Sequence, residues 1–358
     1  VSDIAGNLTS TTISDPLPGT APELDVIGNE TNVDSIVPDF PVPPVTIENR
    51  PLGDGDDLII NFGTFTNLER DPNDEFVIVE FNALVTNSAG NQQGTPLPND
   101  FIVRFDNGPG TDPSPSVTVT VAEPSISVPI KTTISTGPFD AGDLVPYRVQ
   151  YSNGIGPNVS TAYDVQLVDP LPAAKMTLDL GRIRVFRNGT EITTGFTDNS
   201  SSNTVDITVD VVGRGDTIVV TYVAVLTQNV AAGEQIRNAA DVTYTRLPGL
   251  NGTINNPTGS ANTGTPGSPT GERDGSGGIN DYSVATENLI DILNPSLIKT
   301  ITNTNISETT ANQFDTGITD LAVGEIVTYT LLISMPEGTT PLVLTDQLPT
   351  GAAGEMQV

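Results

Sequence analysis

Short segments of alternating apolar and polar residues run along the chain and end at Gly, Asn, Asp or Pro. Four of them are rich in β-branched residues: 143–151, 204–212, 216–226 and 241–245. In the first, Val145, Tyr147 and Val149 fall on one face of a strand, and Arg148 and Gln150 fall on the other. Because successive side chains of a strand point to opposite faces, this alternation is typical of a half-buried strand. No segment keeps a helical period, so the sequence predicts an all-β protein.

Three landmarks recur in the same order in the middle and last thirds of the chain. They are a Lys-Thr pair at Lys131 and Lys299, a Gly-acid-x-Val-x-Tyr stretch that ends at Tyr147 and Tyr329, and an Asp-x-Leu-Pro strand end at Asp169 and Asp346. The spacing between the two copies varies a little. This variation indicates insertions in the loops between shared strands.

The first third of the chain matches the second half of this repeat. Residues 74–87 correspond to 216–229, and residues 99–105 correspond to 238–244. The sequence therefore predicts three tandem units: an incomplete unit over 1–124, a complete unit over 125–294 and an incomplete unit over 295–358. Within the middle unit, residues 251–278 are too poor in apolar residues to pack, so we expect a flexible excursion or a long surface loop there.

These landmarks, together with Asn238-Ala239-Ala240 later in the middle unit, resemble a known tandem repeat of large bacterial and archaeal surface proteins. That family is a domain of unknown function, number eleven in its series. The resemblance covers the middle unit well and the flanking units in part, and it implies an immunoglobulin-like sandwich displayed outside the cell. About seven strands with frequent turn signals also favour two packed antiparallel sheets, with a barrel as the alternative.

Charge and composition narrow the function. The chain has 44 acidic and 14 basic residues, for a net charge of -30, and this disfavours nucleic acid, because phosphate binding needs clustered Lys and Arg. Without cysteine or histidine, the chain lacks disulfides, thiol nucleophiles, the Ser-His-Asp triad and the usual zinc ligands. No apolar run approaches the length of a membrane span. We therefore expect neither an enzyme nor a membrane-spanning protein.

One constellation of the middle unit carries chemistry: Lys131, Asp169 and Asn238. In pilin and adhesin sandwiches of related architecture, a first-strand lysine condenses with a last-strand asparagine, assisted by a buried carboxylic acid, and the resemblance implies these roles here. Burial favours a neutral amine, which can attack the carboxamide, and a protonated acid, which can polarise its carbonyl. The alternative is a surface lysine, an aspartate that caps a turn and an asparagine in a turn.

Lys299 and Asn99 are the corresponding residues of the two incomplete units. The last unit supplies early strands with Lys299, and the first supplies late strands with Asn99. Neighbouring subunits would then complete one sandwich by strand addition and crosslink at these residues. From the sequence we favour the other interpretation, truncation of a longer array, because it explains more easily why Asp-x-Leu-Pro occurs near both ends.

Acid-rich loops are candidates for calcium, because hard cations bind carboxylate and carbonyl oxygens. The candidate ligands are Asp54, Asp56, Asp57, Asp71 and Asp74. None of these loops has a full EF-hand pattern, and solvated turns are the alternative. The chain also has seven Asn-x-Ser/Thr sites, which permit glycans at a frequency that composition alone explains.

Together these features predict a structural protein of tandem sandwich units at the cell surface. It would form part of an extracellular fibre, sheath, appendage or surface layer, with copies of itself or neighbouring repeats as partners. The alternative is an adhesin stalk or a ligand-binding cell-surface protein.

Overall fold

The computed structural model describes residues 85, 90–105, 113–248, 282–306, 320–351 and 354–358, together with the backbone of six short strands between Leu24 and Phe81. The chain divides into two units, Val1–Thr86 and Asn87–Val358. The division into 1–124, 125–294 and 295–358 stays a prediction, and the excursion at 251–278 lies outside the described residues.

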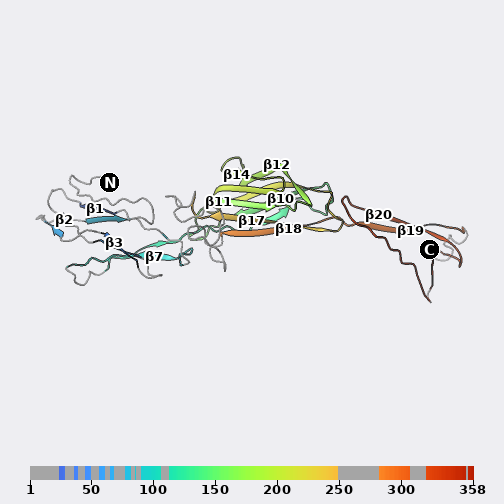
Figure 1. Ribbon diagram of the computed structural model, residues 1–358, viewed down its shortest axis with the longest axis horizontal. Helices are drawn as coiled ribbons and strands as arrows, with labels where there is room; N and C mark the ends of the chain where they lie inside the picture. The colour runs from blue at the N-terminus through green and yellow to red at the C-terminus, as the bar shows by residue number, and fades with distance from the viewer. Residues whose placement is uncertain are drawn as a thin grey trace. The chain divides into compact units, whose positions relative to one another are not determined.

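Every regular element of the described residues is a β-strand, which confirms the all-β prediction (Figure 1). The first unit contains three antiparallel pairs: β1 (Leu24–Gly28) with β6 (Val77–Phe81), β2 (Ile36–Pro38) with β5 (Phe65–Asn67), and β3 (Val45–Asn49) with β4 (Asp56–Ile60). Among the described residues, the structure contains no helix of the length and apolar character that crossing a bilayer requires.

Two five-stranded antiparallel sheets form the middle of the second unit (Figure 1). The first sheet has the order β13 (Thr190–Ile192), β12 (Met176–Arg187), β16 (Thr217–Leu226), β10 (Leu144–Ser152), β9 (Ile130–Thr133). The second has the order β14 (Phe196–Asp198), β15 (Thr204–Val212), β11 (Ala162–Pro170), β17 (Gln235–Thr245), β18 (Ser283–Asp291). Because the sheets are separate, this part is a sandwich, and the barrel alternative is wrong for it.

One continuous apolar core lies between these two sheets. Along β10 and β16, buried side chains alternate with more exposed ones, because every second residue points into the core. Val149 and Val220 of the first sheet and Leu167 and Ile207 of the second are fully buried. The predicted alternation at 143–151 is therefore confirmed, and burial of this apolar surface holds the sandwich together.

Two further antiparallel pairs flank the sandwich along the chain. One joins β7 (Pro96–Asn99) to β8 (Val117–Thr120), and the other joins β19 (Ser296–Thr304) to β20 (Val327–Ser334). Most side chains of these four strands are exposed. In the described residues, neither pair belongs to a larger sheet.

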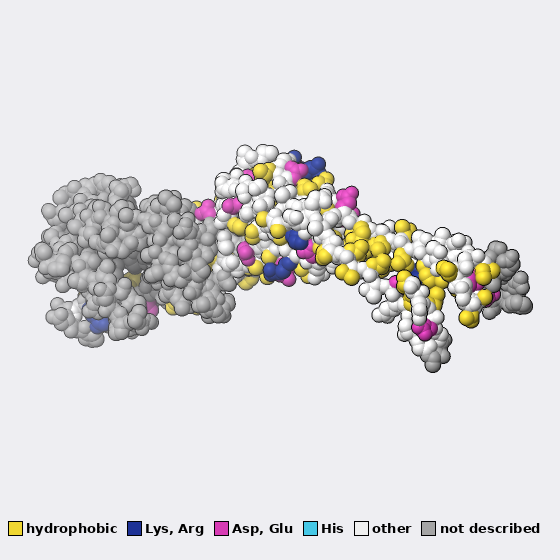
Figure 2. All heavy atoms as spheres, turned by 45° about the vertical axis from the view of Figure 1, so that its right-hand side comes forward, with side chains coloured by type: hydrophobic (Ala, Val, Ile, Leu, Met, Phe, Trp, Pro, Cys, Tyr) yellow, Lys and Arg dark blue, Asp and Glu magenta, His cyan; other side chains and the backbone are white. Residues whose placement is uncertain are grey.

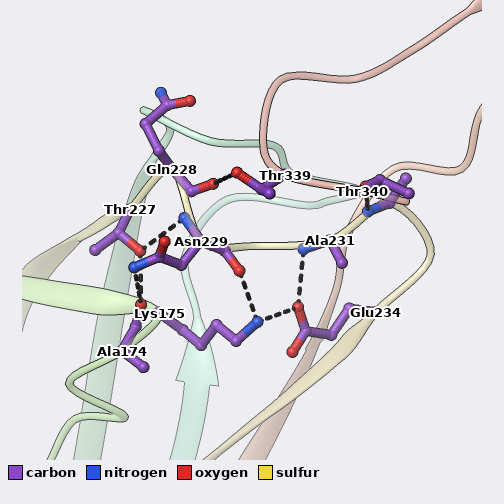
Figure 3. Close-up of polar contacts among 10 residues, drawn as sticks. Ala174, Lys175, Thr227, Gln228, Asn229, Ala231, Glu234, Thr339 and Thr340 are labelled. Carbon is purple, nitrogen blue, oxygen red and sulfur yellow. Dashed lines mark hydrogen bonds and ion pairs between the residues drawn. The ribbon is translucent and has the colours of Figure 1, made fainter. Parts of the chain in front are cut away.

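The loop after β20 contacts one end of the sandwich at a site we call the joint, formed by residues 335–340 and the β16–β17 loop (Figure 3). Thr339 Oγ1 donates to the carbonyl of Gln228 at 2.8 Å, and the amide of Ala232 donates to Thr340 Oγ1 at 2.7 Å. These bonds join segments more than a hundred residues apart in sequence. The joint therefore connects the loop after β20 to the β16–β17 loop.

Gly338 allows the close approach of the backbones at the joint. Its φ is +133°, and a Cβ at this position would lie 2.4 Å from the carbonyl oxygen of Val230. A residue with a side chain fits neither this φ nor this space. On the sandwich side, Lys175 Nζ holds the β16–β17 loop by an ion pair of 2.8 Å with Glu234 (Figure 3).

Candidate crosslinking site

Strand β9 directs Lys131 into the sandwich. The strand pairs with β10, and Lys131 lies opposite Val149. The alternation along β9 leaves Ile130 57% exposed and Lys131 only 4% exposed. The alternative of a surface lysine is therefore wrong.

Asp169 and Asn238 come from the facing sheet. Asp169 lies near the end of β11 and Asn238 lies on β17, and both are almost completely buried. Lys131 Nζ donates to Asp169 Oδ1 and Oδ2, each at 2.7 Å. Lysine and aspartate thus form a buried ion pair that bridges the two sheets.

Tyr222 completes the site and is not among the site residues predicted from the sequence. This residue lies on β16, and its hydroxyl donates to Asp169 Oδ2. Asn238 Nδ2 donates in turn to the Tyr222 hydroxyl at 3.2 Å. Beneath these groups, the rings of Tyr147 and Tyr222 stack with centroids 5.2 Å apart, and Lys131 Nζ lies 5.3 Å from the Tyr147 centroid. One hydrogen-bond network therefore connects the lysine, the acid and the amide.

Burial shifts the pKa values of Lys131 and Asp169 in the directions that favour the neutral form of each side chain. It lowers the pKa of Lys131 from its ordinary value to about 8, although the attraction of Asp169 opposes this shift. Burial likewise raises the pKa of Asp169, against the opposing effect of Lys131. It raises the pKa of Tyr222 well above its ordinary value too, so this hydroxyl stays a donor. Transfer of one proton from lysine to aspartate is consequently easier here than in water.

The carbonyl oxygen of the Asn238 side chain has no hydrogen-bond partner among the described residues, although it is buried. A buried acceptor left unsatisfied costs about 1–3 kcal/mol. A protonated Asp169 would supply the missing donor. The arrangement thus favours a state in which the acid activates the carboxamide carbonyl.

The β19–β20 pair carries a lysine in the same register, and an aspartate after β20 pairs with it. Lys299 lies opposite Leu331, two residues after Tyr329, just as Lys131 lies opposite Val149, two residues after Tyr147. Lys299 Nζ donates to both oxygens of Asp346 at 2.8 Å and lies 4.2 Å from the Tyr329 centroid.

The contact beneath each lysine also recurs. The hydroxyl of Tyr147 lies 3.9 Å from Met176 Sδ, and that of Tyr329 lies 3.8 Å from Met356 Sδ. The copies differ in burial, because the Lys299 side chain is 40% exposed and that of its acid 34%. Among the described residues, no asparagine hydrogen-bonds to this second pair.

The remaining predicted site residues lie elsewhere. Asn99 ends β7, is exposed and lies opposite Val117 of β8, so the structure does not bring it to Lys299. The side chains of the predicted calcium ligands lie outside the described residues: Asp54, Asp56, Asp57, Asp71 and Asp74. In the described part of the chain, no three acidic side chains gather to hold a metal ion.

Comparisons with known proteins give only a distant likeness. No family model matches the chain, and no curated protein gives a significant match. Similar solved structures include the T6 backbone pilin of Streptococcus pyogenes serotype M6, with 13% identity, 78% of this chain and 62% of that chain covered, and a TM-score of 0.33. The major pilin SpaA of Corynebacterium diphtheriae has 15% identity, with 66% and 56% covered and a TM-score of 0.31.

A third similar structure is the collagen-binding domain from a Staphylococcus aureus adhesin, with 11% identity, 45% of this chain and 96% of that chain covered, and a TM-score of 0.25. The chain spans less than two thirds of each of the two pilins. At such scores the likeness establishes neither a shared fold nor a shared function.

Proposed function

We propose that the sandwich forms an amide bond between Lys131 Nζ and Asn238 Cγ, and that the protein is a structural component of an extracellular assembly at the cell surface. A fibre, sheath, appendage or surface layer would use it in the same way. The buried ion pair of Lys131 and Asp169, in one network with the Asn238 amide, carries this proposal. Ion pairs buried in a core stabilise less than apolar packing of similar volume, so this pair favours a chemical role.

The reaction uses only the side chains of the site. A proton passes from Lys131 Nζ to Asp169, which leaves a neutral amine and a carboxylic acid. The amine attacks Asn238 Cγ while Asp169 protonates Asn238 Oδ1. The Cγ–Nδ2 bond then breaks, and Nδ2 leaves as ammonia with a proton that came from Nζ. One amine and one carboxamide thus give one secondary amide and one ammonia, and Asp169 ends protonated.

The bond would serve a mechanical purpose. It joins β9, the edge strand of one sheet, to β17 of the other and closes a loop of 107 residues (238 minus 131). By analogy with disulfides of that loop size, it contributes about 4–5 kcal/mol to stability. Without it, β9 is held to its sheet by a ladder of only four register pairs with β10. A covalent bridge at this strand suits a part that bears load.

The intact mass of the denatured full chain tests the bond. We expect a mass below that of the sequence by one ammonia, with a crosslinked peptide that contains Lys131 and Asn238. Lys131→Met and Asn238→Ala should each restore the sequence mass. Lys175→Ala is the matched control, because it removes a partly exposed lysine and should keep the loss. An unmodified wild-type mass contradicts the bond.

Negative-stain microscopy of the purified chain tests the structural role. Regular polymers support a fibre, sheath or layer. Isolated beaded rods favour the alternative of an adhesin stalk that holds a binding domain away from the cell.

A further inference from the structure

Exposed apolar side chains neighbour the second lysine–acid pair in strand register and in sequence, and we call them the receiving face. It consists of three leucines: Leu331, opposite Lys299, and Leu342 and Leu344, shortly before Asp346. These leucines are 37%, 52% and 55% exposed, and Figure 2 shows hydrophobic side chains gathered over this part of the chain. The equivalent residues of the middle repeat are completely buried: Val149, Val165 and Leu167. The receiving face is therefore the surface of a sandwich core without its cover.

The backbone beside the receiving face is also free to pair. Residues 341–347 belong to no strand, whereas the equivalent residues of the middle repeat lie in β11. In the sandwich, β11 pairs with β17, the strand that carries Asn238. An added strand would satisfy the unpaired peptide groups of residues 341–347.

A segment of the required pattern lies at residues 99–105, which begin at the last residue of β7. Asparagine and apolar residues alternate there at Asn99, Phe101, Val103 and Phe105, and the three apolar side chains are 68%, 43% and 62% exposed. The equivalent residues of β17 are all buried: Asn238, Ala240, Val242 and Tyr244. The side chains at 101, 103 and 105 are thus partly exposed at the positions where β17 closes the core.

We propose that residues 99–105 of a second copy of this chain add to residues 341–347, cover the receiving face and bring Asn99 of the second copy to Lys299 for an amide bond. The register of β11 and β17, carried over to this pair, sets Leu344 opposite Val103. Within one chain the two surfaces have other neighbours, since Asn99 lies opposite Val117 in the β7–β8 pair. Every added copy offers one strand and one receiving face, so the contact propagates head to tail into a linear polymer.

The covalent step rests on the amide chemistry proposed for the middle site. When the added strand covers Lys299 and Asp346, it excludes water from them. The pair is then buried as Lys131 and Asp169 are in the sandwich. Asp346 first takes a proton from Lys299 Nζ, and the neutral amine then attacks Cγ of Asn99 of the second copy. A second proton from Nζ passes through Asp346 to the departing Nδ2, and Asp346 ends protonated. The Cγ–Nδ2 bond breaks, ammonia leaves, and one amide links the two copies. The pair stays inert until the strand docks, so assembly itself switches on the reaction.

Net charge sets the conditions for assembly. Each copy carries a charge of -30, so two copies repel one another at low ionic strength. Salt screens this repulsion within about 8–10 Å at ionic strengths near 0.1–0.15 M. Crosslinking between copies should accordingly speed up with added salt, whereas the reaction inside the sandwich should not.

Mixing two full-length variants tests the proposal. Lys299→Ala keeps the strand and loses the nucleophile, while Asn99→Ala keeps the receiving face and loses the acceptor. Each variant is expected to stay monomeric on a denaturing gel. Their equimolar mixture should give a covalent dimer and nothing larger, whereas the wild-type chain and Lys175→Ala should give a ladder. Peptide mapping of the dimer should place the new bond between residues 99 and 299.

The outcomes separate this proposal from the middle-site bond. A mixture that stays uncrosslinked while each variant still shows the ammonia loss of Lys131 and Asn238 overturns the second-copy proposal and leaves the proposed function intact. A wild-type monomer with its own Lys299 joined to its own Asn99 also overturns it, because the chain would then close on itself. A wild-type ladder without the Lys131–Asn238 bond would support the proposal and refute the middle-site bond.

Discussion

Replacing Asn238 by alanine removes the acceptor of the proposed bond but leaves the Lys131–Asp169 ion pair in place. Closure of the 107-residue loop (238 minus 131) is worth about 4–5 kcal/mol by analogy with disulfides. The hydrogen bond from Asn238 Nδ2 to the hydroxyl of Tyr222 is not added, because Nδ2 leaves as ammonia when the amide bond forms. The free energy of unfolding should therefore fall by about 4–5 kcal/mol, a large share of the stability of an ordinary domain.

Guanidinium unfolding of the full chain, followed by tyrosine emission, measures this difference. The chain has no tryptophan, and Tyr147, Tyr151 and Tyr222 lie in the sandwich core, so the signal reports on the relevant part. Lys175→Ala serves as the control and should change the free energy of unfolding by less than about 1 kcal/mol, because its ion pair is partly exposed. A loss of only about 1 kcal/mol in Asn238→Ala, the value of its hydrogen bond, would refute the reasoning.

Three further predictions concern rate, pH and the joint. Tyr222→Phe should slow bond formation in freshly refolded chain, followed by intact mass, because the acid and the amide each lose a partner. The rate of bond formation should not change with pH while Lys131 and Asp169 hold one proton between them. It should fall as pH rises above about 8, the lowered pKa of Lys131, because Asp169 then has no proton to donate. A rate that keeps rising above that pH contradicts the shared-proton mechanism. Gly338→Ala should speed hydrogen exchange of the amides of the joint, since its Cβ would lie 2.4 Å from a carbonyl oxygen. Gly354→Ala, at φ +140° with nothing within 4 Å, has similar backbone strain without the clash and should leave that exchange unchanged.

The strands of the sandwich were predictable because alternation along the chain reports which side chains are buried. The predicted segment at 204–212 coincides with β15, and that at 216–226 differs from β16 by one residue. The grouping of Lys131, Asp169 and Asn238 was predictable from the order of the landmarks and from the resemblance they carry. Distances and burial were not, because they depend on how two sheets face one another.

Tyr222 and the joint escaped prediction for a related reason. Tyr222 occupies a buried position of β16 between two half-buried residues, like any core residue of that strand. Its position opposite Tyr147 follows only from the register of β16 with β10. The sequence signal for Tyr222 was its place in the alternation, which puts its side chain on the core-facing side of the strand. This signal does not tell whether the side chain makes an apolar contact or donates a hydrogen bond. The joint depends on the meeting of two loops distant in sequence, for which neither loop has a local pattern.

The two proposed amide bonds, taken together, would define the path of tension along a linked polymer. Force entering a copy at Asn99 and leaving at Lys299 would otherwise extend all 200 residues between them (299 minus 99). A bond between Lys131 and Asn238 takes 107 of these residues out of the path (238 minus 131), which withholds about 370 Å of chain at about 3.5 Å per residue. With the lysine on β9, the first strand of the unit, and the asparagine on β17, late in the unit, the bond would withhold most of the chain of the unit. The positions of the two residues in the repeat thus suit resistance to extension.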